Sequence, residues 1–218
     1  MASSMQDKVA LSYYDSLLRE SDVALLIGAN WINDKIIGFY FEYLEHELFS
    51  DNRDQVCFIT PDVTQFIKIY NGPELSMFLD PLGLSDKDLV LLAVNNNASS
   101  EHSGGSHWSL LVYVRKENTF YSWDSCHSLN LLPSQQCAQK VTPFLSVPSQ
   151  PVFSEVPSCP QQTNGYDCGV FVLLFAECSC SVHLRDSSAD KTLQSINNDN
   201  CVQFRVRCLE LIKKLSLN

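Results

Sequence analysis

The stretch QQTNGYDCGVFVLLFAEC, residues 161–178, joins a polar turn to a long apolar run. The run predicts a helix that is buried on nearly all sides, and Cys168 stands at the start of that helix. The unpaired backbone N–H groups at a helix N-terminus carry partial positive charge, which stabilises a thiolate. We therefore expect a core helix that holds a cysteine nucleophile in its first turn, with the rest of the chain arranged around it.

Length and composition indicate a single domain over residues 1–218. The 218 residues suffice for a sizeable core, and no linker rich in Pro, Gly or Ser divides them. The formal net charge of −10, without a long Lys/Arg cluster, argues against nucleic acid as a partner and favours a basic protein. No apolar run reaches the roughly 18 residues of a membrane span. The chain also starts without the apolar core of a signal peptide, so we expect a cytoplasmic or nuclear protein that is not bound to a membrane.

The nine cysteines could form disulfides or bind a structural metal, and the sequence favours neither role. A disulfide framework is disfavoured because the count is odd, the chain is long and no export signal is present. A structural zinc site is disfavoured because Cys178, Cys180 and His183 have no second pair of ligands at a suitable spacing. Most of these thiols are therefore expected to be small buried apolar groups.

Three helices are expected in the first half of the chain. They follow residues 11–26, which carry a short amphipathic pattern. Asn33 and Asp34 stand where helix N-caps belong, ahead of a mostly apolar segment. Pro61 fits the first position of the next helix, with Thr60 as its cap. The expected helices span residues 36–49, 61–70 and 73–82.

The middle of the chain changes to the pattern of strands. Continuous apolar runs and segments rich in aromatic and β-branched residues replace the helical spacing. The expected strands span residues 89–95, 107–114, 119–124 and 152–155. If the chain turns at residues 115–117, the two strands pair in antiparallel fashion. Residues that lie opposite each other then have numbers that sum to about 231 to 233. This register brings His107 at the start of one strand within reach of Asp124 at the end of its neighbour.

His107 and Asp124 are the two groups that a cysteine nucleophile requires. A thiol is activated by an imidazole that takes its proton, and an acceptor on the other ring nitrogen orients the imidazole. Each residue could also be purely structural, as a solvated histidine at a strand start and as a turn-forming aspartate. Their expected adjacency, together with Cys168 at a helix start, favours a catalytic group. Cys126 follows closely after Asp124, and a turn cysteine without a catalytic role is its favoured interpretation.

Four separated motifs resemble those of the Ulp/sentrin-specific cysteine proteases. They are WINDKIIGFYFEYL at residues 31–44, His107-Trp108, Asp124 in SWDS, and Gln162 ahead of Cys168 in QQTNGYDCG. The resemblance keeps the same order from residue 11 to residue 180, whereas the segment 181–218 has a helical pattern but few familiar residues. Within the family, the segments are most similar to members that act on the ubiquitin-like modifier of neddylation.

The resemblance implies a role for each matching residue. Cys168 would attack the carbonyl of the modifier's terminal glycine and form a thioester. His107 would act as general base and then general acid, with Asp124 holding its ring. Gln162 would donate its side-chain amide to the oxyanion, beside the backbone N–H of Cys168. Gln161 is the alternative donor, and its spacing to the cysteine fits less well.

The resemblance also implies how the substrate is held. Trp31 and Trp108 match tryptophans that roof a narrow channel, through which only a side-chain-free Gly-Gly tail can thread. Trp31 could instead be a hydrophobic staple, and Trp108 could be a core residue. Asp34 is either a contact to the modifier or a helix cap. The polar, glycine-containing loop 96–106 is the segment expected to move when substrate enters.

The expected helices and strands, together with the family resemblance, predict an α+β fold with the papain-like arrangement of a cysteine protease. In this arrangement helices flank a central mixed sheet. The expected enzyme cleaves after the C-terminal diglycine of the modifier of neddylation. It would process the precursor and release the modifier from conjugated lysines, cullin-type conjugates being implied by the resemblance. We expect a monomer that needs no metal or cofactor. The alternatives are a SUMO-directed protease and an inactive module that binds a ubiquitin-like protein.

Overall fold

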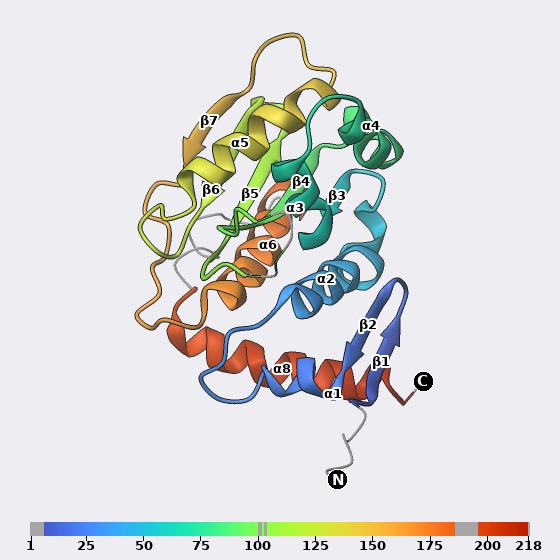
Figure 1. The fold of residues 1–218 in the computed structure, drawn as a ribbon, viewed down its shortest axis with the longest axis vertical. Coiled ribbons are helices and arrows are strands. Elements are labelled where there is room, and N and C mark those ends of the chain that lie inside the picture. Colours follow the sequence, from blue (N-terminus) through green and yellow to red (C-terminus); the bar gives the residue numbers. More distant parts are fainter. Residues whose placement is uncertain (1–6, 100–101, 103, 186–195, 218) are drawn as a thin grey trace.

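The structure is a computed structural model that describes residues 7–99, 102, 104–185 and 196–217 (Figure 1). The strands are β1 (Val9–Tyr13), β2 (Ser16–Arg19), β3 (Val56–Ile59), β4 (Leu89–Asn95), β5 (Trp108–Val114), β6 (Thr119–Trp123) and β7 (Val152–Glu155). The α-helices are α1 (Glu20–Ala24), α2 (Asp34–Tyr43), α3 (Pro61–Ile69), α4 (Pro73–Leu79), α5 (Leu131–Val141), α6 (Cys168–Arg185) and α8 (Asn198–Leu215). The π-helix η1 (Leu44–Leu48) continues α2, and short 3₁₀ turns are η2 (Ser50–Asn52), η3 (Asp80–Leu82), η4 (Leu84–Asp86), η5 (Arg115–Glu117) and η6 (Thr142–Phe144).

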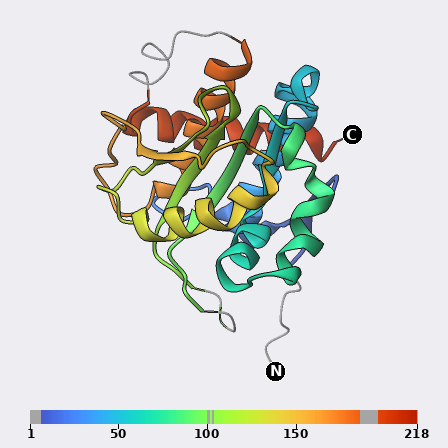
Figure 2. The ribbon, with the colours of Figure 1, turned by 90° about the horizontal axis from the view of Figure 1, so that it is seen from above.

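A five-stranded mixed sheet forms the centre of the α+β fold, as expected. Its order is β3-β4-β5-β6-β7, with parallel pairs at the two edges and antiparallel pairs in the middle. Because successive residues of a strand face opposite sides, β4 divides its side chains between two hydrophobic clusters. Leu91 packs in the cluster that contains residues of α2, α6 and α8, whereas Leu92 packs in the cluster that contains residues of α3 and α5. Figure 2 shows these helices above and below the sheet.

Helix α6 runs through the core, as its sequence predicts. It packs on β5 and β4, and its first nine residues include Cys168, Val170, Phe171, Leu173 and Ala176, which are all buried. Among the described residues it is the one helix long and apolar enough to cross a membrane, but 61% of it is buried inside the fold. A core helix meets the same criterion, and the burial assigns α6 to the core.

The start of the chain, whose sequence has an amphipathic pattern, is mostly a hairpin of two strands. Residues 9–19 form a two-stranded antiparallel hairpin, β1-β2, and only α1 is helical before the loop. Leu11 pairs with Leu18, and both side chains are buried. Their spacing in the sequence would also fit the buried face of a helix, although they lie on two adjacent strands. Tyr14 at the hairpin tip has a φ of 46°, in the left-handed region that a tight hairpin turn needs.

The other expected elements are confirmed with changed ends. Asn33 caps α2, because its side chain accepts a hydrogen bond from the backbone N–H of Ile36, so Asp34 is the first helical residue and the expectation of Asp34 as a cap is wrong. Thr60 caps α3 with Pro61 at the first position, as predicted. Strand β3 and helix α5 were not anticipated from the sequence, since β3 has four residues and α5 has an irregular apolar pattern.

Candidate active site

The first turn of α6 places Cys168 at the end of the central helix. Its side chain is 3% exposed, and the helix begins with a hydrogen bond from the N–H of Phe171 to the carbonyl of Asp167. The central strand β5 starts at Trp108, so His107 immediately precedes this strand, and it lines the same cavity as Cys168. The side chain of Cys168 helps to raise the pKa of His107. The fold thus brings together an imidazole and a thiol that are distant in the sequence.

His107 is held from its other side by Asp124. Its Nε2 lies 2.6 Å from Oδ1 of Asp124, and the two side chains are 3% and 4% exposed. Strand β6 ends one residue before Asp124, and β5 and β6 pair with Leu110 opposite Trp123, at the upper limit of the expected register. His107 and Asp124 therefore meet just beyond the hydrogen-bonded part of the hairpin.

The electrostatics of the pair favour a charged imidazolium. Burial alone would lower the pKa of His107, but the hydrogen bonds and charges of Asp124 and Cys168 outweigh it and raise the pKa to about 9. Burial also works against ionisation of Asp124, yet the hydrogen bonds from His107 and from two backbone N–H groups lower its pKa below the usual value. Both partners therefore keep their charges at neutral pH.

This pKa predicts the pH dependence of catalysis. His107 loses its proton as pH rises through about 9, so kcat/KM should fall in that range as the charged imidazolium is lost. Because Asp124 raises the pKa of His107, Asp124→Asn should move the alkaline limb to lower pH. A kcat/KM profile of both proteins would measure this shift, and an alkaline limb that stays in place would contradict it.

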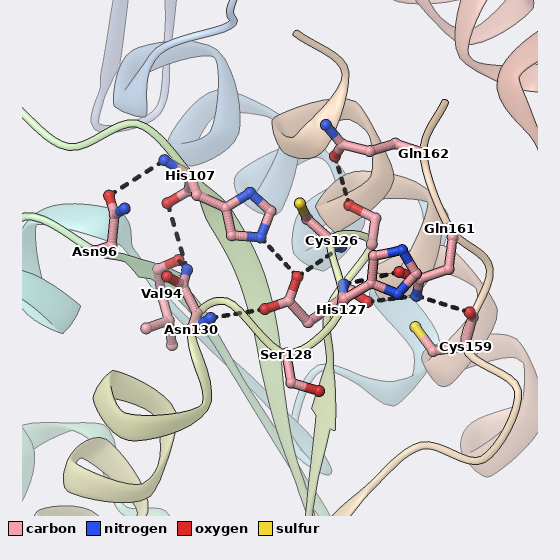
Figure 3. Close-up of polar contacts among 12 residues, drawn as sticks. Val94, Asn96, His107, Cys126, His127, Ser128, Asn130, Cys159, Gln161 and Gln162 are labelled. Atoms are coloured by element: carbon pink, nitrogen blue, oxygen red, sulfur yellow. Dashed lines mark hydrogen bonds and ion pairs between the residues drawn. The ribbon is translucent and has the colours of Figure 1, made fainter. Parts of the chain in front are cut away.

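Asn130 holds Asp124 and His107 in their relative positions (Figure 3). The backbone N–H of Asn130 donates to Oδ2 of Asp124 at 2.8 Å, and that of Cys126 donates to Oδ1 at 2.8 Å. The fully buried side chain of Asn130 donates to the carbonyls of Val94 and His107 at 2.9 and 3.3 Å. Sequence reasoning missed Asn130, because an asparagine before a helix is an ordinary cap or turn residue.

The two glutamines have different partners. The Gln161 side chain donates to the carbonyl of Asp124 at 2.9 Å and accepts from the N–H of His127 at 2.8 Å. Gln162 instead directs its amide toward Ser125, whose hydroxyl donates to Oε1 at 2.8 Å, and toward the carbonyl of Asn164. Gln161 thus stabilises the turn after β6. The amide nitrogen of Gln162 instead contacts Asn164, in the loop that leads to Cys168.

A buried arginine on α8 supports Asp167, the residue that precedes Cys168. Nε and Nη2 of Arg205 lie 3.0 and 2.7 Å from Oδ1 of Asp167, and both side chains are almost completely buried. The same guanidinium donates to the carbonyls of Leu25 and Asn30 at 2.9 and 2.8 Å. One side chain therefore ties the nucleophile's helix to the loop that carries Trp31, and the C-terminal segment contributes to the site although its sequence is less familiar.

Loss of this arginine should be costly for stability. Arg205→Met leaves the carboxylate of Asp167 buried and unpaired, which should lower the free energy of unfolding by about 3–5 kcal/mol. Arg207→Met is the matched control on α8, because Arg207 pairs with Glu177 at 2.7 Å through a side chain that is 55% exposed. Because the guanidinium of Arg207 is half-exposed and Glu177 keeps its hydrogen bond from Tyr40, the loss of Arg207 should cost only about 1 kcal/mol. Urea denaturation measures both, and equal losses would contradict the structural role of Arg205.

The tryptophans border a cavity that leads to Cys168. This cavity has a volume of about 250 Å³, and its walls include Trp31, Asp34, Gly105, Trp108 and Cys168. Trp31 is 51% exposed, and its indole N–H donates to the carbonyl of Gly165 at 2.6 Å, next to the nucleophile's loop. A side chain on Gly105 would be strained, because its φ is 88° and a Cβ there would lie 1.8 Å from Oδ1 of Asn95, whose side chain would have to shift. Glycine therefore suits this wall of the cavity.

The remaining predicted residues are also placed. Asp34 lies in the wall of this cavity and of a larger neighbouring one of about 560 Å³, and its carboxylate pairs with Lys35 at 3.4 Å. Cys126 supports Asp124 through its backbone N–H, while burial and the nearby charges of Asp124 and Cys168 raise the pKa of its thiol. All nine cysteines are free thiols in the structure.

Comparisons with known proteins agree with this arrangement. Residues 30–217 match the model of the Ulp1 protease family, C-terminal catalytic domain. The chain is 45% identical over 211 residues to sentrin-specific protease 8 of Homo sapiens, covering 96% of this chain and 99% of that protein. It is 37% identical over 225 residues to NEDD8-specific protease 1 of Arabidopsis thaliana, covering 99% and 97%. The Ulp1 protease domain solved in complex with Smt3, the yeast orthologue of SUMO, superposes with a TM-score of 0.76 at 18% identity, covering 99% of this chain and 91% of that chain.

Proposed function

The chain belongs to the Ulp1 family of cysteine peptidases, and we propose that it cleaves after the C-terminal diglycine of the ubiquitin-like modifier of neddylation. Its substrates would be the modifier's precursor and its conjugates on lysine, including those of the cullin type. The observation that carries this proposal is the position of His107, which is hydrogen-bonded to Asp124 and lines the same cavity as Cys168 and the two tryptophans. The name of the plant relative, NEDD8-specific protease 1, supports the choice of modifier.

The proposed reaction begins with the thiolate of Cys168, which attacks the carbonyl carbon of the modifier's terminal glycine. The imidazolium of His107 then gives its proton to the departing amine, and a thioester remains on Cys168. Water, deprotonated by His107, attacks this thioester and releases the free modifier. Asp124 holds the ring in one orientation and stabilises its positive charge in both steps.

Two donors would stabilise the oxyanion of each tetrahedral intermediate. One is the backbone N–H of Cys168 and the other is the side-chain amide of Gln162. The donors act on negative charge that develops only during the reaction, so they accelerate the chemical step more than they strengthen substrate binding. Trp31 and Trp108 would confine the Gly-Gly tail, since any side chain on the last two residues would collide with the indole rings.

The test of this proposal compares three modifiers, those of neddylation, SUMO and ubiquitin, each with a fluorogenic amide on its terminal glycine. We expect the highest kcat/KM for the neddylation modifier. A preference for SUMO would retain the chemistry and overturn the proposed substrate. Failure of all three substrates with folded protein would overturn the proposed activity and favour a binding module.

A further inference from the structure

Ser125 connects the residue that orients the base to the proposed oxyanion donor. It follows Asp124 directly at the end of β6, and its side chain is 1% exposed. Its hydroxyl donates to Oε1 of Gln162 at 2.8 Å, and its carbonyl accepts from the backbone N–H of the same glutamine at 2.8 Å. Ser125 therefore fixes both the backbone and the side chain of Gln162.

The orientation of the Gln162 amide determines whether it can act on an oxyanion. Only the NH₂ end can donate, and the last torsion of glutamine has no strong intrinsic preference between the two orientations. The carbonyl of Asn164 is 2.6 Å from Nε2 and can only accept, so the nitrogen must occupy that end. Oε1 then faces Ser125, whose hydroxyl must be the donor. One proton of Nε2 is used by Asn164, and the second remains for the substrate.

The neighbouring hydrogen bonds make this unit rigid. Gln161 donates to the carbonyl of Asp124 and accepts from the N–H of His127, on either side of Ser125. The segments 124–127 and 161–162 are consequently joined by bonds from both glutamines. The hydroxyl of Ser125 is buried within this network, so its direction is restricted and its hydrogen bond can hold the amide of Gln162 in place.

We propose that Ser125 is a positioning residue for Gln162, so that the dipeptide Asp124-Ser125 orients the base through one side chain and the oxyanion donor through the next. This inference rests on the proposed function, because it assigns Gln162 to the oxyanion. Without the Ser125 hydroxyl, Oε1 loses its buried donor and the amide can turn away from the reacting carbonyl. The transition state loses stabilisation, whereas binding of the modifier is unaffected.

The test is steady-state kinetics of Ser125→Ala on the modifier substrate that the wild type hydrolyses best. We expect kcat to fall about 10-fold to 100-fold, the effect of a small misplacement of a catalytic group, while KM stays the same. The limbs of the pH profile should not move, because the bond between His107 and Asp124 is intact. In a Gln162→Ala background, Ser125→Ala should cause no further loss, since the amide that it positions is absent.

Ser179→Ala is the matched control. Ser179 on α6 is also 1% exposed, but its hydroxyl has no hydrogen-bond partner among the described residues, so its loss should leave kcat and KM unchanged. Thermal unfolding confirms that each variant is folded. If Ser125→Ala does not fold, Ser125→Cys fills the site with a slightly larger side chain that is a much weaker donor, and it should still lower kcat at constant KM.

Three outcomes would overturn the inference. They are an unchanged kcat in a folded Ser125 variant, a shifted pH profile, and an equal loss with and without Gln162. The first would show that Gln162 needs no hydroxyl, and the other two would show that Ser125 acts through Asp124 or through general stability. Failure of the proposed function has a different result, because the wild type itself would then hydrolyse none of the modifier substrates.

Discussion

Cys168→Ala is expected to abolish hydrolysis of the modifier substrate, with a loss in kcat on the order of 10⁶-fold, as for other nucleophiles in covalent mechanisms. The variant has no atom that can form the thioester, and His107 has no thiol to deprotonate. The surface that binds the modifier is unchanged, so the affinity for intact modifier should remain. Single-turnover kinetics and calorimetry on the same preparation would measure these two quantities.

Cys178→Ala is the control for the loss of a buried thiol in the same helix. Cys178 is 2% exposed and lies in α6 beyond the catalytic turn, so its substitution should reduce stability slightly and leave kcat unchanged. Residual turnover by Cys168→Ala that exceeds contamination by wild type would show that another group is the nucleophile. A loss of modifier affinity in parallel with the rate would show that Cys168 supports the fold of the cleft.

Asp124→Asn is expected to lower kcat about 10⁴-fold with little change in KM, by comparison with the equivalent change in a serine protease triad. An asparagine can offer its NH₂ group to Nε2 of His107 and so favour the wrong tautomer of the imidazole. It also removes the negative charge that raises the pKa of His107. The same protein would therefore show both a lower rate and an alkaline limb at lower pH.

The control for this substitution is Asp86→Asn, which removes an exposed carboxylate in η4 and should leave kcat and KM unchanged. Steady-state kinetics with the modifier substrate separates the two constants. A rise in KM with an unchanged kcat would show that Asp124 serves the binding surface and not the base. A rate equal to that of the wild type would exclude Asp124 from the catalytic group.

The site was predictable where its chemistry lies in local motifs. Cys168 could be placed because a polar turn followed by an apolar run marks a helix N-terminus, and α6 begins at that residue. The contact between His107 and Asp124 followed from a hairpin whose turn was visible in the sequence. In the observed pairing the two residues lie beyond Leu110 and Trp123, the last pair of the hairpin, and are not directly opposite each other. The side chain of His107 is long enough to reach Asp124 across this offset.

The supporting residues were not predictable, because their partners are distant in the sequence. Arg205 meets Asp167 across 38 residues and the carbonyl of Leu25 across 180, and no local pattern indicates which arginine of a helix will be buried. Asn130 and Ser125 belong to residue types that are common in turns, so their sequence signal is weak. Such polar networks depend on tertiary packing, which brings their members together after the local elements have formed.

The hairpin at the start of the chain could not be predicted from its amphipathic pattern, for a related reason. Leu11 and Leu18 have a spacing that fits one face of a helix, but they lie opposite each other on β1 and β2. A period of seven residues does not distinguish a helix face from two strands that turn back on each other. Both leucines are buried in the core cluster that includes residues of α2 and α8, and this tertiary burial decides between the two structures.

The central claim is that Cys168 is the nucleophile of an enzyme for the modifier of neddylation. Its most direct test is to incubate the wild type with three modifiers, those of neddylation, SUMO and ubiquitin, each carrying a cysteine-reactive group at its C-terminus, and to locate the adduct by mass spectrometry. We predict that the neddylation modifier labels the protein selectively and that the adduct is on Cys168 alone among the nine cysteines. An adduct on another cysteine, or selective labelling by SUMO or ubiquitin, would contradict this account.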